Sequence, residues 1–348
     1  MKKLLTVVIV VSIVSAAWLW SAYQDSLNTK LNIGSEELSY SIKAGKSLSA
    51  VLYDLHKKKI INHPRYLLWY ARLNGLANEM KAGDYLLSNN LKAKQFLDNI
   101  FNGKVIQFSL TVIEGWSFQQ LREALYNHPN IRPTTKTLSE NEIMVKLGMP
   151  NVHHEGQFLP DTYHFPNQLT DLEFLKRAHE SMKTVLKEEW DKRAVGLIYA
   201  NPYEALIMAS IVEKETGQAY ERAQIAGVFV RRLEKRMRLQ TDPTVIYGMG
   251  KSFKGNIRKR DLLRDTPYNT YRRPGLPPTP IALPGRDAIH AALHPADGDA
   301  LYFVSRGDGS HVFSATLQEH NNAVIKYQLK GRARSFSSYK HKKKDNNE

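Results

Sequence analysis

The most strongly patterned stretch of the chain is residues 202–217, where apolar side chains occupy most positions of a predicted helix. Asn201 is a favoured residue just before a helix, Pro202 suits its first turn, and Gly217 is typical of the left-handed turn that ends one. A helix that is apolar on all sides is expected inside a protein. The pattern therefore predicts a buried helix with two glutamates near its end.

The second of these glutamates, Glu215, follows Ile211 and Val212 by one helical turn, so its carboxyl is expected to lie against apolar side chains. Apolar surroundings and the negative end of the helix dipole both raise the pKa of a carboxyl. A carboxyl that is protonated near neutral pH can give a proton to a leaving oxygen. Glu213, Lys214 and Glu215 also fit a solvated helix end, since most charge clusters lie on the surface.

The N-terminus carries an uninterrupted apolar run at residues 4–20, preceded by Lys2 and Lys3. A helix of that length spans roughly 26 Å, enough for a bilayer core, and aromatic residues follow where an interfacial belt would lie. The small residues at 15–17 also fit a cleaved signal peptide. The lysines predict a single-pass anchor in the inner (cytoplasmic) membrane, with residues 1–24 as cytoplasmic stub and membrane helix and the remainder outside the cytoplasm.

The next segment, residues 25–105, is predicted to be a polar stalk followed by a small α/β module. Residues 38–42 alternate apolar and polar side chains as a strand does, a glycine turn follows, and Ser47 can cap a helix. The pattern continues as helix, strand and helix. The order strand, helix, helix, strand resembles a LysM glycan-binding module, particularly at residues 42–48.

Helices and short strands mix over residues 106–330, which predicts a larger α+β catalytic domain and an α+β fold class for the chain. Asp242 precedes Pro243 and is expected outside helical geometry. Residues 331–348 are basic and poor in apolar side chains, which predicts a disordered tail. The main predicted elements are helices at 117–126, 171–195, 219–236, 286–293 and 316–329, and a hairpin formed by 301–305 and 311–314.

Composition narrows the classes of partner. The chain has 348 residues, 42% of them hydrophobic, which is enough for a large core. Its formal net charge is +15, which suits an anionic partner such as nucleic acid, a lipid surface or an anionic polymer. A domain outside the cytoplasm makes nucleic acid the least suitable of these. The chain has no cysteine, which excludes disulfides, thiol nucleophiles and thiolate metal sites.

Histidines offer one candidate metal pair, His290 and His294, which share a helix face. Pro295 follows at once, and the sequence has no HExxH pattern of the kind that binds zinc in metalloproteases. Core or surface histidines are the favoured interpretation, so neither a metal nor another cofactor is predicted.

Several ordered motifs resemble those of the YceG-like family of membrane-anchored endolytic murein transglycosylases, and with the anchor and the small module the resemblance covers nearly the whole chain. The motifs are residues 209–216, 239–250, 267–271 and 275–278, with weaker support from 160–163 and 302–304.

The resemblance implies that Glu215 is the catalytic residue. The family cuts the β-1,4 bond between N-acetylmuramic acid and N-acetylglucosamine within a strand and leaves a 1,6-anhydro end, so one carboxyl can serve as acid and then as base without a water nucleophile. It also implies work beside peptidoglycan synthases, where the enzyme limits strand length. Polar residues that would contact the glycan and stabilise its positive transition state are Glu155, Gln240, Asp242, Tyr268 and Asn269.

Two other functions stay open. A lysozyme-like hydrolase would use Glu215 as acid and Glu155 or Asp242 to activate water. A non-catalytic wall-binding scaffold would need no acid at all. A metal-dependent amidase is disfavoured by the histidine pattern described above.

Overall fold

The computed structural model of the protein describes residues 2–34 and 37–332, and these form two compact units. The first unit is the chain up to Ser109 together with His164–Leu169. The second is Leu110–Tyr163 together with the chain from Thr170 onward. The predicted basic tail lies outside the described residues from position 333 on.

The N-terminal apolar run forms a long helix, α1 (Lys2–Asn28). It is long and apolar enough to cross a membrane, by length and composition. The helix continues past the predicted anchor, and Leu27 near its end is buried in the core of the first unit. Leu31 and Ile33 join the same core, so the predicted polar stalk instead packs against the module that follows it.

The first unit has the predicted order of strand, helix, helix and strand. Strands β1 (Glu37–Ile42) and β2 (Gly83–Ser88) pair antiparallel, with Tyr40 opposite Tyr85. The Ser47 hydroxyl accepts a hydrogen bond from the Ala50 amide and so caps the first helix, as predicted. The helices of this unit are α2 (Leu48–Lys57), α3 (Pro64–Leu73) and α4 (Ala93–Asn102).

Short paired strands and capped helices make up the chain between the small module and the central helices. Strand β3 pairs with β5, and β4 pairs with β6. Ser117, Ser139 and Thr170 each cap a helix while a glutamine or glutamate side chain three residues later returns the bond. The elements are β3 (Gln107–Thr111), α5 (Phe118–Asn127), β4 (Ile131–Arg132), α6 (Glu140–Lys146), β5 (Thr162–Pro166), β6 (Leu169–Thr170) and α7 (Asp171–Asp191).

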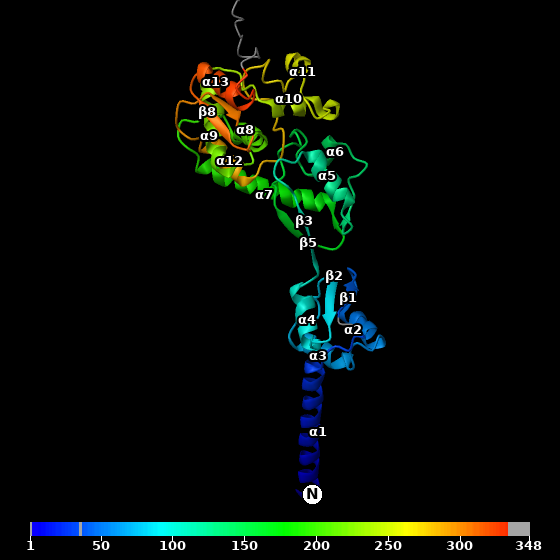
Figure 1. The fold of residues 1–348 in the computed structure, drawn as a ribbon. Coiled ribbons are helices and arrows are strands. Elements are labelled where there is room, and N and C mark those ends of the chain that lie inside the picture. The colour runs from blue at the N-terminus through cyan, green and yellow to red at the C-terminus, as the bar shows by residue number, and fades with distance from the viewer. Residues whose placement is uncertain (1, 35–36, 333–348) are drawn as a thin grey trace, which may run out of the picture. The chain divides into compact units, whose positions relative to one another are not determined.

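The core of the second unit is built around α8 (Pro202–Glu215), which packs against α9 (Arg222–Glu234) and α12 (Arg286–Leu293) (Figure 1). Every residue of α8 from Ala205 to Val212 is buried. The amide of Gly285, just before α12, donates to the Glu213 carboxylate near the end of α8. The opposite end of α12 lies near the start of α8, since the Tyr199 hydroxyl donates to the Ala292 carbonyl. The two helices therefore run antiparallel.

Two predictions about the ends of helices around Glu215 were wrong. Helix α8 ends at Glu215, because Thr216 is extended, and Gly217 does not adopt the left-handed conformation. Thr216 is β-branched, which favours extended backbone, and its hydroxyl accepts a bond from the Gln218 amide. Asp242 is the first residue of a helix, because Pro243 is well tolerated in a first turn.

The remaining elements of the second unit follow the predicted order, with the hairpin β7–β8 in antiparallel register. They are a 3-10 turn (Ala219–Glu221), α10 (Asp242–Met249), a 3-10 turn (Gly250–Ser252), α11 (Lys259–Leu263), β7 (Tyr302–Ser305), β8 (His311–Ser314) and α13 (Leu317–Tyr327).

Candidate active site

Glu215 occupies the last position of α8, where the buried helix reaches the surface of its unit. The side chain is partly exposed, whereas the preceding turns of the helix are buried. Asn201 accepts a bond from the Glu204 amide at the other end of the helix and so fixes where α8 begins. The carboxyl is therefore held on a rigid element, as a catalytic group requires.

Among the described residues, the carboxyl of Glu215 has one hydroxyl partner, Thr241, whose Oγ1 donates to Glu215 Oε1. Thr241 is itself held in place, because its amide donates to Thr270 Oγ1 at 3.1 Å. Thr244 Oγ1 donates to the Thr241 carbonyl at 2.8 Å. This buried threonine cluster fixes the position of the hydroxyl that faces Glu215.

The surroundings of Glu215 keep its proton near neutral pH. Burial raises the pKa of Glu215 to about 7, and the nearby Asp242 carboxylate acts in the same direction. The bond from Thr241 and the positive charges of His311 and Arg232 lower it, but by less than burial raises it. A carboxyl poised near 7 can act both as acid and as base.

Gln240 and Asp242 flank Thr241, the hydrogen-bond partner of Glu215, along the chain, and both are exposed. The Tyr271 hydroxyl donates to Asp242 Oδ1 at 2.6 Å. Gln240 has a left-handed backbone (φ 54°), and buried Arg232 donates to the Leu239 carbonyl at 2.8 Å just before it. These side chains can face a ligand next to Glu215.

Glu155 also carries a proton near neutral pH, but it is sealed inside the protein. It is only 2% exposed, and burial raises its pKa to about 7. Its carboxyl accepts a bond from the Phe118 amide at 2.8 Å and is hydrogen-bonded to the Tyr247 side chain. In this geometry Glu155 joins α5 to α10 and does not face a ligand.

Tyr268 and Asn269 differ in their exposure to solvent. Tyr268 is partly exposed and packs edge-on against Tyr247, with ring centroids 4.9 Å apart. Asn269 is 1% exposed, and its amide nitrogen donates to three backbone carbonyls, those of residues 261, 262 and 264. Of the five predicted contact residues, Gln240, Asp242 and Tyr268 are therefore accessible, whereas Glu155 and Asn269 organise the protein around them.

Glu213, the other glutamate of the motif, points to a different neighbourhood. It accepts a bond from the Gly285 amide at 2.9 Å and lies 3.9 Å from the Arg222 guanidinium. Burial raises the pKa of Glu213, and the bond from Gly285 opposes this rise. The structure thus separates the two glutamates, with Glu213 joining α8 to α12 and Glu215 left facing α10.

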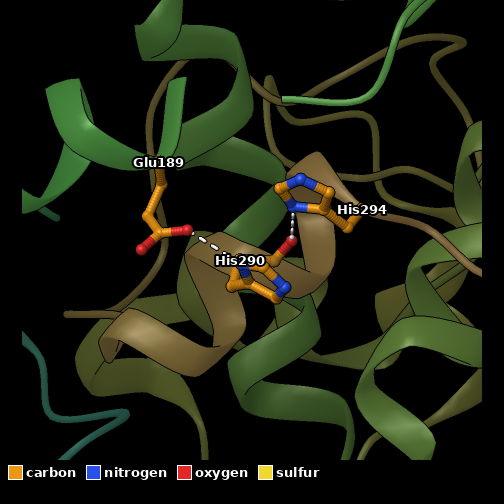
Figure 2. Close-up of side chains that lie close together, drawn as sticks. All are labelled: Glu189, His290 and His294. Atoms are coloured by element: carbon orange, nitrogen blue, oxygen red, sulfur yellow. Dashed lines mark hydrogen bonds and ion pairs between the residues drawn. The ribbon is translucent and has the colours of Figure 1, made fainter. Parts of the chain in front are cut away.

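The candidate metal pair meets a buried glutamate from α7, Glu189, whose ligand atoms and those of His290 and His294 lie within 4.8 Å of one another (Figure 2). These atoms already have protein partners. Glu189 accepts from His290 Nδ1 and Arg286 Nε, each at 2.8 Å. His294 contacts the carbonyls of His290 and Lys192 through its two ring nitrogens. A metal would have to displace these bonds, so the cluster joins α7 to α12 without needing an ion.

Four residues that shape the surroundings of Glu215 were not predicted from the sequence: Thr241, Tyr271, Arg232 and His311. Thr241 and Tyr271 lie within the motifs used above, adjacent to predicted residues, so those motifs could have suggested them. Arg232 lay in a basic helix face and His311 in a hairpin strand, and neither had a local signal that pointed to Glu215.

Comparison with known proteins gives a consistent result. A family model described as the YceG-like family matches residues 40–326. An endolytic murein transglycosylase of Bacillus subtilis (strain 168) is 33% identical over 312 residues, covering 83% of this chain and 84% of that protein. One of Streptococcus pneumoniae (strain D39) is 26% identical over 339 residues, covering 87% of this chain but 61% of that longer protein.

A solved structure agrees with these sequence matches. The crystal structure of a YceG-like protein from Listeria monocytogenes is 31% identical to this chain and superposes with a TM-score of 0.53. The match covers 83% of this chain and 99% of that one.

Proposed function

The chain belongs to the YceG-like family, and on this premise we propose that it is an endolytic murein transglycosylase, a lyase that cuts the glycan strands of peptidoglycan. The observation that carries the proposal is Glu215, a partly exposed carboxyl on a rigid buried helix with a pKa raised to about 7. Such a group suits a reaction in which one residue first gives and then takes a proton.

The reaction we propose breaks the β-1,4 bond between N-acetylmuramic acid and N-acetylglucosamine. Protonated Glu215 gives its proton to the glycosidic oxygen as the bond from the muramyl C1 to that oxygen breaks. The resulting carboxylate takes the proton of the muramyl C6 hydroxyl, whose oxygen bonds to C1 and closes the 1,6-anhydro ring. Glu215 ends protonated again, and no water is consumed.

The accessible polar residues near Glu215 support this chemistry. Positive charge develops on the sugar ring in the transition state of glycoside cleavage. The Asp242 carboxylate, oriented by Tyr271, and the exposed Gln240 side chain can stabilise that charge. We assign Tyr268 to sugar contact as a partly exposed aromatic residue. Glu155 and Asn269 act indirectly, by holding α10 and the loop before residue 271.

A hydrolase is the second candidate, because Asp242 lies close enough to Glu215 to raise its pKa. Two neighbouring carboxyls are the arrangement that glycosidases use. The bond from Tyr271 occupies one oxygen of Asp242, which weakens it as a base for water. Ring closure is therefore favoured over hydrolysis.

Mass spectrometry of purified peptidoglycan after digestion separates these functions. The full-length protein should release products lighter by one water than the products of hydrolysis, and Glu215→Gln should release none. Products of the hydrolysed mass would support the lysozyme-like reaction instead. Equal complementation of cells by the wild type and by Glu215→Gln would support a non-catalytic scaffold.

The resemblance also suggests where the enzyme works. We propose that α1 anchors it in the inner membrane with a cytoplasmic N-terminus, that the small α/β module binds glycan in a LysM-like manner, and that peptidoglycan synthases are its partners. The helix has two lysines at its N-terminal end, as the positive-inside rule requires for this orientation. Protease added outside spheroplasts should degrade the second unit, and protection of that unit would reverse the orientation.

A further inference from the structure

A buried glutamate–histidine pair lies next to the segment that leaves Glu215. Glu221 is 3% exposed and ends the 3-10 turn that follows α8. Its carboxylate accepts the His311 backbone amide at 2.9 Å and His311 Nδ1 at 2.7 Å. Two bonds to one carboxylate fix both the start of β8 and the ring it carries.

The bond to Glu221 also fixes which ring nitrogen faces the carboxylate. Because Nδ1 donates to the carboxylate, Nε2 lies on the side of the ring away from Glu221. The ring is 11% exposed and meets the edge of Phe303, with centroids 5.4 Å apart. Within the described residues, Nε2 has no hydrogen-bond partner. The histidine is therefore rigid, and one of its nitrogens is uncommitted.

His311 interacts electrostatically with Glu215. Its positive charge lowers the pKa of Glu215, as does that of Arg232 on α9, whereas the Asp242 charge on α10 raises it. Tyr271, in the loop before α12, is a further titratable neighbour of Glu215. The β7–β8 turn meets the segment after α8 a second time, since a Cβ on Gly309 would lie 3.1 Å from Gln218 Nε2.

We propose that His311, held by Glu221, is a positioning residue that stabilises the carboxylate form of Glu215 between its two proton transfers. This rests on the proposed function. After Glu215 has protonated the leaving oxygen, the positive charge of His311 stabilises the new carboxylate until it takes the C6 hydroxyl proton. The Glu221 carboxylate keeps the imidazole in place by its bond to Nδ1.

The matched control is the Glu189–His290 pair, which has the same bond, a buried glutamate accepting His Nδ1 at 2.8 Å (Figure 2). It joins α7 to the first turns of α12, and His290 is not among the main groups that shift the pKa of Glu215. An asparagine amide can replace the Nδ1 donor of histidine but carries no charge. His311→Asn and His290→Asn therefore keep each bond and remove each charge.

The test is the pH dependence of kcat/KM for the full-length protein on purified peptidoglycan. His311→Asn should move the alkaline limb up by about one pH unit and lower the plateau about tenfold, because Glu215 becomes a weaker acid. His290→Asn should leave both unchanged. A limb that does not move in His311→Asn, or that moves as much in His290→Asn, would overturn the proposal.

Titration of the Glu215 carboxyl by difference infrared spectroscopy, wild type minus Glu215→Gln, reads the same shift without substrate. His311→Asn should raise the titration midpoint, and an unchanged or lowered midpoint would refute the role of His311. If the wild type forms no anhydro ring but the titration midpoint still rises in His311→Asn, the proposed function is wrong and the role of His311 stands.

Discussion

Two glutamates beside the α8–α12 helix pair each have a histidine nearby, and their pKa values shift in opposite directions. One is Glu215, at the end of α8, with its pKa raised to about 7. The other is Glu189, contributed by α7. Burial alone would raise the pKa of Glu189, yet its bonds to His290 and Arg286 hold that pKa below the ordinary value.

The difference lies in the donors. Each oxygen of Glu189 accepts from a nitrogen of a basic side chain. Within the part of the chain that the structure describes, Glu215 accepts from one neutral hydroxyl, that of Thr241, and the nearby Asp242 carboxylate raises its pKa. Burial alone therefore does not decide whether a glutamate is an ionised structural group or an acid that is protonated near pH 7. The number and the charge of its hydrogen-bond partners decide its pKa.

The largest expected effect is that of removing the acid itself. Glu215→Gln should lower kcat/KM by about 10³-fold, because the amide cannot give a proton. Glu189→Gln should leave activity near the wild-type value and lower the free energy of unfolding by about 1–3 kcal/mol through its lost charged hydrogen bonds. Assays of glycan release and thermal denaturation check both. Equal loss of activity in the two variants would contradict the assignment of Glu189 as a structural group and Glu215 as the acid.

Glu155 extends the comparison to an acid with no access to ligand. A carboxyl with a folded-state pKa of about 7 contributes stability below its unfolded pKa of 4.5, and this is lost as pH rises through 7. In Glu155→Gln this pH-dependent loss should be absent. The free energy of unfolding of the variant minus that of the wild type should therefore increase by up to about 3 kcal/mol between pH 4 and pH 8. Urea unfolding at both values measures it. Glu189→Gln should show the opposite trend, since the pKa of Glu189 is lowered.

Activity should depend on pH with the sign set by Glu215. The acid must be protonated, so kcat/KM should fall about tenfold per pH unit above about 7. A profile measured in constant-ionic-strength buffers shows the limb. A limb near pH 4.5 would mean that Glu215 is an ordinary solvated carboxyl, as the alternative interpretation of the sequence holds.

The smallest expected effect comes from removing the Thr241 hydroxyl, which donates a hydrogen bond to Glu215. Thr241 lowers the pKa of Glu215, so Thr241→Val should move the alkaline limb up and lower the plateau by about three- to tenfold. Thr241→Ser keeps the hydroxyl and should restore both. If the serine variant behaves like the valine variant, packing of the methyl group rather than the hydrogen bond is responsible.

Local patterns predicted the helices well because the apolar periodicity and caps are local. The α8 helix, its Asn201 cap and the span of α12 were predicted in this way. The predicted end of α8 was wrong. Gly217 is a general signal for a helix end, and the sequence pattern does not reveal the hydrogen bond from the Gln218 amide to Thr216.

The site was predicted only in part. Glu215 and the accessible Gln240 and Asp242 could be named from motifs, but Glu155 and Asn269 carry the same residue types and turn out to be buried. A sequence lists polar groups but does not give their exposure. The pairing of His311 with Glu221 joins positions 90 apart, and no local pattern contains it.

Direct titration of the Glu215 carboxyl decides whether this glutamate is a poised acid. Difference infrared spectroscopy of the full-length protein, wild type minus Glu215→Gln, isolates its carboxyl signal from those of Glu155 and Glu189. The structure predicts a midpoint near pH 7, with the acid form present at neutral pH. A midpoint near 4.5 would show that Glu215 holds no proton to give, and the proposed reaction would lose its acid.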